Sequence, residues 1–393
     1  MTPAMPATNG VTGPTPLHGL WQPRLNLKNL YYGSGCVQRY LIETLPSVGS
    51  RVVVTTGKSL ATGTRLVSEL EQLLGSHHIG TISNIRQHGP QADVDAAVDT
   101  ILEAGKNGGV DTIISLGGGS PIDTAKVISL RVKEKLGHFL CHITIPTTLS
   151  AAECTAGGGF TKLNGVKVGF RDPGMGVNTI FYDPHFASAT PKQLWLSTGM
   201  RAMDHAVECM YHSSAAEVPW RALAHWAVGE LFECLPRARD THPHDQETVL
   251  RLMLAAFASS GLKGENIPGG MGLSHSLGHA LGSPYGIPHG ITSCMTLGKV
   301  VQLKVKQSQE NAAMVARLST AIGSPRTGND VQDGLEVGQR ITALANSLGL
   351  DVRPLSGYGV SREETNVIVT RALGGSPDHP DFGVVRQLVD SLF

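Results

Sequence analysis

A run of three glycines directly after an apolar, β-branched segment constrains the fold of the first half of this chain. Residues 110–116 predict a strand, which leads straight into Gly117-Gly118-Gly119. Ser120 belongs to a residue type that caps helices, and Pro121 suits the first helical position, so a helix is predicted to follow. A strand, a glycine turn and a helix make a βα unit, which is typical of a parallel sheet.

Strand-like and helix-like segments alternate through the rest of the first half. Short β-branched runs predict strands at residues 51–56, 81–83 and 142–145, and apolar residues at helical spacing predict helices over 60–74 and 94–104. This alternation indicates a parallel sheet, in which ligands bind at the carboxyl ends of the strands.

The second half has a different pattern, which begins near residue 190. Apolar residues recur at helical spacing over residues 194–212, 219–235, 248–262, 295–305 and 311–321, with few convincing strands between them. At 393 residues the chain is long enough for two domains. We therefore predict an α/β amino-terminal domain with a parallel sheet, followed by an all-helical carboxyl-terminal domain.

The glycine run is also a candidate phosphate site. Because glycine has no side chain, a diphosphate can approach the backbone there, and the N–H groups and dipole of a helix N-terminus favour its charge. The run matches neither Gly-x-Gly-x-x-Gly nor the Walker pattern. A tight turn between strand and helix would also require glycine, so these residues alone leave both explanations open.

Four histidines form a second candidate site. His275 and His279 are four residues apart, so on a helix they project from nearly the same face. The breaker-rich residues 282–288 allow the chain to fold back and bring His289 toward them, and His205 completes the set. Neutral imidazole is a common metal ligand and also the usual general acid or base near neutral pH, and ordinary structural histidines are the third explanation. The pattern alone does not choose among them.

Composition limits the partners. Lys plus Arg and Asp plus Glu number 32 each, so no net charge favours nucleic acid or an anionic membrane. Apolar runs are too short for a membrane span. The six cysteines are scattered without a Cys-x-x-Cys pair, and residues 1–17 do not read as a secretory signal. We expect a soluble, cytoplasmic protein that binds a small molecule, with a loose tail over residues 1–27.

Four ordered motifs together resemble the iron-containing alcohol dehydrogenase superfamily: residues 117–126, Ile145-Pro146-Thr147-Thr148, the helix around His205, and residues 272–290. The resemblance extends over most of the chain. It implies a dinucleotide-binding α/β domain over residues 28–190 and a helical domain carrying the histidine cluster over residues 191–393, with a nicotinamide cofactor between them.

The resemblance also implies roles for individual residues. Gly117, Gly118, Gly119 and Ser120 would hold the cofactor diphosphate, with Asp123 in the same motif. Thr147 and Thr148 would line the cofactor cleft. His279 would lie beside the substrate as the proton donor or relay.

One departure from the superfamily pattern concerns the metal. In metal-dependent members an Asp and three histidines bind a divalent cation, and His205, His275 and His289 match the histidine positions. Arg201 stands where the Asp would be. A guanidinium cannot ligate a cation and repels it, so Fe or Zn is disfavoured.

This departure, together with residues 146–153, resembles the maleylacetate reductase branch, which reduces an unsaturated dicarboxylate without an obligatory metal. Arg201 would then bind a substrate carboxylate through two hydrogen bonds. The structural alternative is an ion pair between Arg201 and Asp204 or Glu208 on the same helix face.

The end of the strand at residues 51–56 bears on the cofactor. NAD-selective relatives resemble one another in carrying an Asp there that would bind the adenosine ribose. Gly57 removes this acid, and Lys58 would attract a 2′-phosphate, although a solvent-exposed lysine on a turn is the simpler explanation. NADPH is therefore expected, with NADH close behind.

We predict an NAD(P)H-dependent oxidoreductase, similar to maleylacetate reductases, that acts on a carboxylate-bearing carbonyl compound or conjugated alkene as a homodimer. His279 is the predicted proton relay, Arg201 the carboxylate anchor, and His205, His275 and His289 a polar pocket. Two alternatives remain open. One is a metal-dependent alcohol dehydrogenase in which Asp204 or water replaces the lost ligand, and the other is a non-redox isomerase or lyase.

Overall fold

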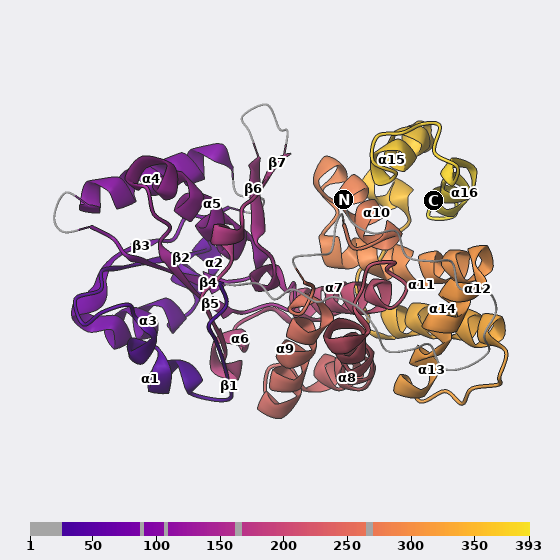
Figure 1. Cartoon of the computed structure of the whole chain (residues 1–393), viewed down its shortest axis with the longest axis horizontal. Coiled ribbons are helices and arrows are strands. Elements are labelled where there is room, and N and C mark those ends of the chain that lie inside the picture. The colour runs from indigo at the N-terminus through magenta and orange to yellow at the C-terminus, as the bar shows by residue number, and fades with distance from the viewer. Residues whose placement is uncertain (1–25, 87–89, 106–108, 162–166, 265–269) are drawn as a thin grey trace, which may run out of the picture.

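The computed structural model describes residues 26–86, 90–105, 109–161, 167–264 and 270–393. Residues 1–25, most of the predicted tail, lie outside the described part. Figure 1 shows a first half in which helices surround a sheet and a second half built of helices. The predicted fold class is therefore confirmed.

A parallel six-stranded sheet forms the centre of the first half. Its order is β1 (Asn29–Tyr32), β8 (Thr179–Tyr182), β5 (Cys141–Pro146), β4 (Thr112–Gly117), β2 (Val52–Thr56) and β3 (His78–Ile82). The four predicted strands are present within a few residues. We did not predict β1 and β8, because four residues are too few to show a clear periodicity.

Helices cover both faces of this sheet. Alternate residues of β2 face opposite ways, so Val53 packs in one apolar cluster while Val52 and Val54 pack in another. The first cluster includes residues of α4 (Gln91–Gly105) and α5 (Gly119–Leu136), and the second includes residues of α1 (Cys36–Tyr40) and α3 (Leu66–Leu74). Figure 1 shows these helix pairs above and below the strands. Burial on both faces explains why the strands read as continuous apolar runs.

One local prediction in this half needs correction, and one hairpin was not predicted. The helix predicted over residues 60–74 is two helices, α2 (Lys58–Gly63) and α3, because Thr64 between them is extended. An antiparallel hairpin of β6 (Gly157–Thr161) and β7 (Lys167–Arg171) escaped prediction, since glycine is depleted in strands. A side chain at Gly158 would lie 2.7 Å from the Asp123 carbonyl oxygen, so the glycine allows β6 to approach α5.

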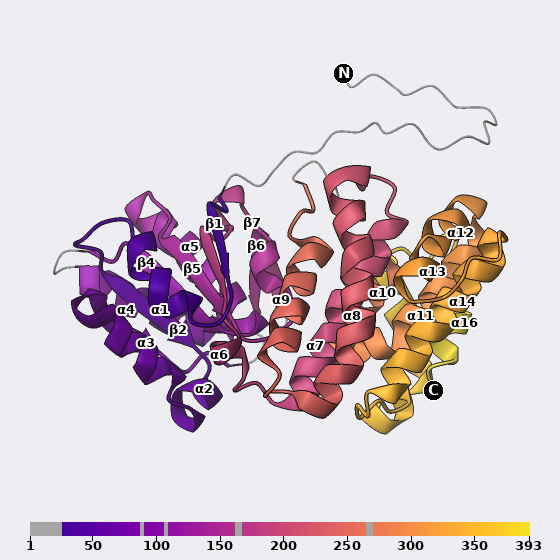
Figure 2. The same ribbon diagram turned by 90° about the horizontal axis from the view of Figure 1, so that it is seen from below.

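The second half is organised around α7 (Lys192–Met210), which packs beside α8 (Ala222–Thr241) and α9 (Gln246–Ser260), as Figure 2 shows. The remaining helices are α10 (Leu273–Tyr285), α11 (His289–Gln307), α12 (Gln309–Ala316), α13 (Leu318–Ala321), α14 (Asp330–Ser347), α15 (Thr365–Ala372) and α16 (Phe382–Asp390), and a short α6 (Pro184–Ala187) joins the halves. The helix predicted over 295–305 begins earlier, and that over 311–321 is two helices. Within the described residues, no helix is long and apolar enough to cross a membrane.

Helix α7 is largely buried, and it carries polar side chains into the interior. Fifteen of its residues are buried, among them Arg201, Asp204, His205 and Glu208. These four occupy positions i, i+3, i+4 and i+7, so they share one face of the helix. Buried polar groups are stable only when they are hydrogen-bonded or paired, so this face must find its partners on neighbouring helices.

Candidate active site

The sheet register brings the predicted cofactor residues together. Thr56 at the end of β2 is opposite Leu116, and Gly117 at the end of β4 is opposite Pro146 of β5. The segments that follow these strands therefore emerge side by side at the carboxyl edge of the sheet. They contain Gly57 and Lys58, the glycine run, and Thr147 and Thr148. This edge is where α/β proteins bind ligands.

The glycine turn has a structural reason as well as an open helix end. Gly117 has φ +147°, which L side chains rarely adopt, and its carbonyl oxygen accepts a hydrogen bond from the Thr147 N–H at 2.9 Å. A Cβ on Gly118 would lie 2.8 Å from Thr148 Cγ2. The turn therefore needs glycine for its own packing, which does not exclude a bound diphosphate.

Ser120 does not cap the following helix, which corrects the sequence prediction. Helix α5 begins at Gly119, and its N-cap is Gly118, which has no side chain to cap it. Pro121 is consequently the third helical residue, within the first turn, rather than the first. An N-terminus without a side-chain cap leaves backbone N–H groups for an anion.

Lys126, whose role the sequence did not reveal, holds the loop beside this turn. Its side chain is fully buried, and Nζ donates to the carbonyl oxygens of Ala152 and Gly157, at 2.7 and 3.0 Å, and to Thr155 Oγ1 at 2.8 Å. Nζ also contacts Asp123 Oδ1 at 3.2 Å. Asp123 thus pairs with a buried lysine in the same motif.

A direct hydrogen bond joins the loop after β5 to the helical half. The Leu149 N–H donates to Thr198 Oγ1, on α7, at 3.1 Å. Thr198 lies one turn before Arg201 on the same helix. The proposed cofactor loop and the second cluster are therefore attached to the same rigid element.

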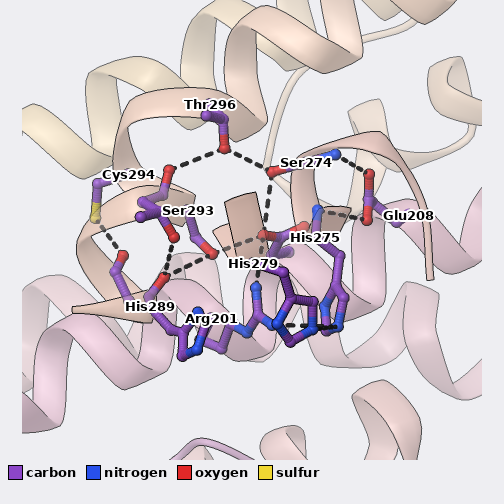
Figure 3. Close-up of polar contacts among 12 residues, drawn as sticks. Arg201, Glu208, Ser274, His275, His279, His289, Ser293, Cys294 and Thr296 are labelled. Atoms are coloured by element: carbon purple, nitrogen blue, oxygen red, sulfur yellow. Dashed lines mark hydrogen bonds and ion pairs between the residues drawn. The ribbon is translucent and has the colours of Figure 1, made fainter. Parts of the chain in front are cut away.

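The four histidines do meet, and they come from three helices. His205 lies on α7, His275 and His279 lie on α10, and His289 opens α11. Neighbouring ring centroids are 5.3 Å apart for His205 and His275, 4.7 Å for His275 and His279, and 5.2 Å for His279 and His289. Figure 3 shows Arg201 beside the rings of His275, His279 and His289. The predicted fold-back before His289 is therefore present.

Arg201 fixes the protonation of the adjacent rings. Its Nη2 lies 3.2 Å from His275 Nε2, and because a guanidinium only donates, this ring nitrogen must accept. Burial, with the Arg201 charge, holds the pKa values of His205 and His275 well below the usual histidine range, so both rings are neutral. His279 Nε2 lies 3.1 Å from the same His275 Nε2, so His279 is the donor in that pair.

The two acidic residues of α7, Asp204 and Glu208, contact Arg201 and the start of α10, respectively. Arg201 is 7% exposed, and its Nη1 lies 3.6 Å from Asp204 Oδ2, so the ion pair considered from the sequence is present. Glu208 accepts the N–H groups of Ser274 and His275, at 2.7 and 3.2 Å, and so caps the N-terminus of α10. Ser274 gave no signal in the sequence beyond its place beside His275.

Comparison with known proteins gives consistent matches. Residues 28–184 match the family model for iron-containing alcohol dehydrogenase, and residues 195–388 match the carboxyl-terminal model of the same family. Maleylacetate reductase 2 of Cupriavidus pinatubonensis is 28% identical over 299 residues, which cover 76% of this chain and 77% of that protein. The maleylacetate reductase of a Pseudomonas species is 28% identical over 350 residues, 89% of this chain and 90% of that protein.

Solved structures share the fold. The crystal structure of maleylacetate reductase from Agrobacterium tumefaciens has a TM-score of 0.78 at 24% identity, covering 96% of this chain and 98% of that one. The structure of a 1,3-propanediol oxidoreductase has a TM-score of 0.81 at 19% identity, covering 96% of this chain and 100% of that one. At these identities the likeness concerns the fold alone.

The histidines do not fit a divalent metal. A metal ligand needs a free lone pair, but Nε2 of His275 already accepts from Arg201. The guanidinium places a permanent positive charge where a cation would have to sit. Across the described ranges, no group of three or more His, Cys, Asp or Glu side chains is placed to hold an ion.

We predict that Gly118→Val weakens NAD(P)H binding by about tenfold or more, because overpacking against Thr148 costs about 1–3 kcal/mol and distorts the turn. Titration calorimetry measures the dissociation constant. Gly80→Val on β3 is the matched control, since a Cβ there meets nothing within 4 Å. Unchanged affinity in a folded Gly118→Val protein would show that the cofactor does not use this turn.

We further predict that activity needs no divalent metal, because Arg201 occupies the position of a ligand. Prolonged treatment with a chelator should leave turnover within about twofold of the untreated protein, well short of the ~10²-fold loss of a missing catalytic group. Elemental analysis of the purified protein provides the parallel measurement. Stoichiometric Fe or Zn that is lost together with activity, and restores it on re-addition, would contradict this prediction.

Proposed function

Because this chain belongs to the iron-containing alcohol dehydrogenase family and is an oxidoreductase, we propose that it transfers a hydride from NAD(P)H to a carboxylate-bearing carbonyl compound or conjugated alkene. Because this chain is an oxidoreductase, the isomerase or lyase that the sequence left open is no longer favoured. The nicotinamide, when bound, supplies the hydride. The protein must then orient the substrate and provide a proton.

One observation carries the proposal: two hydrogen-bond donors converge on a single acceptor. The Arg201 Nη2 group and the His279 Nε2 group both point to His275 Nε2, at 3.2 and 3.1 Å. An imidazole nitrogen has one lone pair, so it cannot satisfy both donors fully. A substrate oxygen that develops negative charge would take over one of them, which is the requirement for stabilising a reduced carbonyl or enolate.

His279 is the side chain best placed to act as the proton donor. It is exposed, whereas His205 and Arg201 are buried. Its Nε2 carries a proton because the neighbouring His275 Nε2 accepts. Reduction adds a hydride to one substrate atom and a proton to the oxygen or the second alkene carbon, and His279 would deliver that proton.

Arg201 supports an acidic substrate. Its Nη1 is buried and has no hydrogen-bond acceptor among the described residues, although Asp204 lies 3.6 Å away. An unsatisfied guanidinium donor favours a carboxylate, which can accept two parallel hydrogen bonds. The relatives named as maleylacetate reductases suggest the same class of substrate.

The strand ends support NADPH more than NADH. Gly57 is the N-cap of α2, and Lys58, the first residue of that helix, is exposed. A glycine leaves no acid to repel a 2′-phosphate, and the lysine adds attraction. A homodimer and a cytoplasmic location stay predictions from the sequence.

We predict different kinetic defects for the two donors. Arg201→Lys keeps the charge beside Asp204 but loses the planar fork, so the KM for acidic substrates should rise about 10–100-fold, as expected for losing a charged hydrogen bond of ~1.5–3 kcal/mol. His279→Ala should lower kcat by about 10²–10⁴-fold while NAD(P)H affinity is retained. Steady-state kinetics on maleylacetate and related oxo-acids measures both.

His185→Ala serves as the control for these kinetics. His185 is a half-exposed histidine of α6 that contacts Glu69 and Phe186, neither of which belongs to the cluster. It should retain parental kcat and KM. If both site variants also retain parental values on the substrate that the protein uses best, the reaction takes place elsewhere in the chain.

We predict that Gly57→Asp turns cofactor preference toward NADH by about tenfold or more, because a carboxylate beside a 2′-phosphate is a like-charge contact. The backbone at Gly57 has φ −86°, and an added Cβ would meet the Ile85 carbonyl oxygen only at 3.8 Å, so a side chain fits. The ratio of kcat/KM for NADPH and NADH is the measurement. Gly57→Asn, equal in size but uncharged, should shift the ratio much less, and equal shifts in both variants would argue against the electrostatic explanation.

A further inference from the structure

Asp204 connects the three helices that carry the histidines. It is fully buried on α7, where the adjacent residue is His205. Its Oδ2 accepts a hydrogen bond from Ser293 Oγ on α11 at 2.6 Å and another from Ser274 Oγ on α10 at 3.1 Å. One carboxylate oxygen therefore joins α7, α10 and α11 at a single point.

The two serines stand directly beside the histidines they would position. Ser274 precedes His275, and Ser293 lies four residues after His289 on the same helix face. Ser274 Oγ also lies 2.9 Å from Thr296 Oγ1, which extends the contact along α11 (Figure 3). A shift of Asp204 would therefore disturb both α10 and α11, which carry three of the four rings.

Electrostatics ties Asp204 to Arg201. A lone charge in this interior would be costly, but the guanidinium 3.6 Å away compensates the carboxylate. The second carboxylate oxygen, Oδ1, has no hydrogen-bond partner among the described residues, so Oδ2 carries all these contacts. Burial raises the pKa of Asp204, while Arg201 and the two serine hydroxyls act against that rise.

Glu208 is a further buried acid on the same face, one turn along α7. Burial and the neighbouring Asp204 charge raise its pKa well above the usual range. Both of its carboxylate oxygens accept hydrogen bonds from backbone N–H groups at the N-terminus of α10, and the Tyr211 hydroxyl donates to Oε1 at 3.3 Å. Glu208 thus fixes the start of α10. Both acids act electrostatically on Arg201, with Asp204 the stronger of the two and the one within ion-pair distance.

We propose that Asp204 is a positioning residue that, paired with Arg201, performs the structural task of an active-site cation: it fastens α7, α10 and α11 together and so sets the geometry of the histidines. The arginine supplies the positive charge and the aspartate binds the helices. This goes beyond the proposed function and rests on it only for the kinetic readout.

The first test replaces Asp204 with an uncharged residue of the same shape. Asp204→Asn should lower kcat by about tenfold or more, the size of a lost charged hydrogen bond, with NAD(P)H affinity unchanged. In protein with isotope-labelled histidine and no substrate, the imidazole NMR signals of the cluster should shift or broaden. Ser293→Ala should show the same changes in weaker form.

Asp333→Asn is the matched control. Asp333, on α14, is a buried carboxylate of the helical half. Its Oδ2 accepts a hydrogen bond from Arg326 Nε at 2.8 Å. This control should lower the melting temperature while leaving kcat and the cluster imidazole signals as in the parent. Ser259→Ala removes a buried hydroxyl that donates within its own helix, to the Ala256 carbonyl oxygen, and controls for Ser293→Ala in the same way.

A double variant keeps the test decisive if single variants are unstable. Arg201→Met and Asp204→Asn each leave one buried group without its partner, so each should lower the melting temperature. The double variant should melt no lower than the less stable single variant. Additive losses would overturn the pairing of Arg201 with Asp204.

The outcomes separate this proposal from the proposed function. If Asp204→Asn changes only the melting temperature, as Asp333→Asn does, and leaves the imidazole signals in place, Asp204 is not a positioning residue. If the imidazole signals change but no acidic substrate is reduced by the parent protein, Asp204 keeps its positioning role and the proposed substrate class is wrong.

Discussion

The burial of a permanent positive charge on α7 is the constraint on which the site depends. Arg201 cannot lose its proton, so the surrounding structure must compensate it or accept from it. Asp204 does the first and His275 does the second. Because these partners lie on α7 itself and on α10, satisfying one side chain fixes how two helices meet.

The α/β half meets this cluster through backbone contacts rather than through a shared apolar layer alone. The glycine turn allows Thr147 and Thr148 to lie against the end of β4, and the Leu149 N–H then reaches Thr198 on α7. Lys126 holds the following residues, Ala152 and Thr155, by hydrogen bonds. The loop after β5 and the histidine cluster are therefore connected through α7, which would place the proposed hydride donor and proton donor in one frame.

Arg201 also explains why this chain, although it belongs to an iron-containing family, has histidines that do not fit a metal. Three histidines are retained, yet the lone pair of His275 is used by a guanidinium and the fourth position carries a positive charge. The same rings then act as hydrogen-bonding groups. Their low pKa values keep His205 and His275 neutral, which leaves Arg201 as the charge that a substrate anion would meet.

The sequence by itself determined the fold class, the glycine turn and the pairing of His275 with His279, because each depends on local spacing: strand into glycine into helix, and histidines four residues apart. The breaker-rich segment before His289 and the order of the motifs indicated His289 and His205. The sequence did not reveal β1, β8 or the hairpin of β6 and β7, whose short or glycine-rich strands are stabilised by partners distant in the chain. It misplaced the cap at Ser120, because the turn at Gly117 and Gly118 sets where α5 begins. Only the tertiary structure decided that Asp204 joins Ser274 and Ser293, about 70 and 90 residues away, since a buried carboxylate takes whichever donors the packing of helices brings to it.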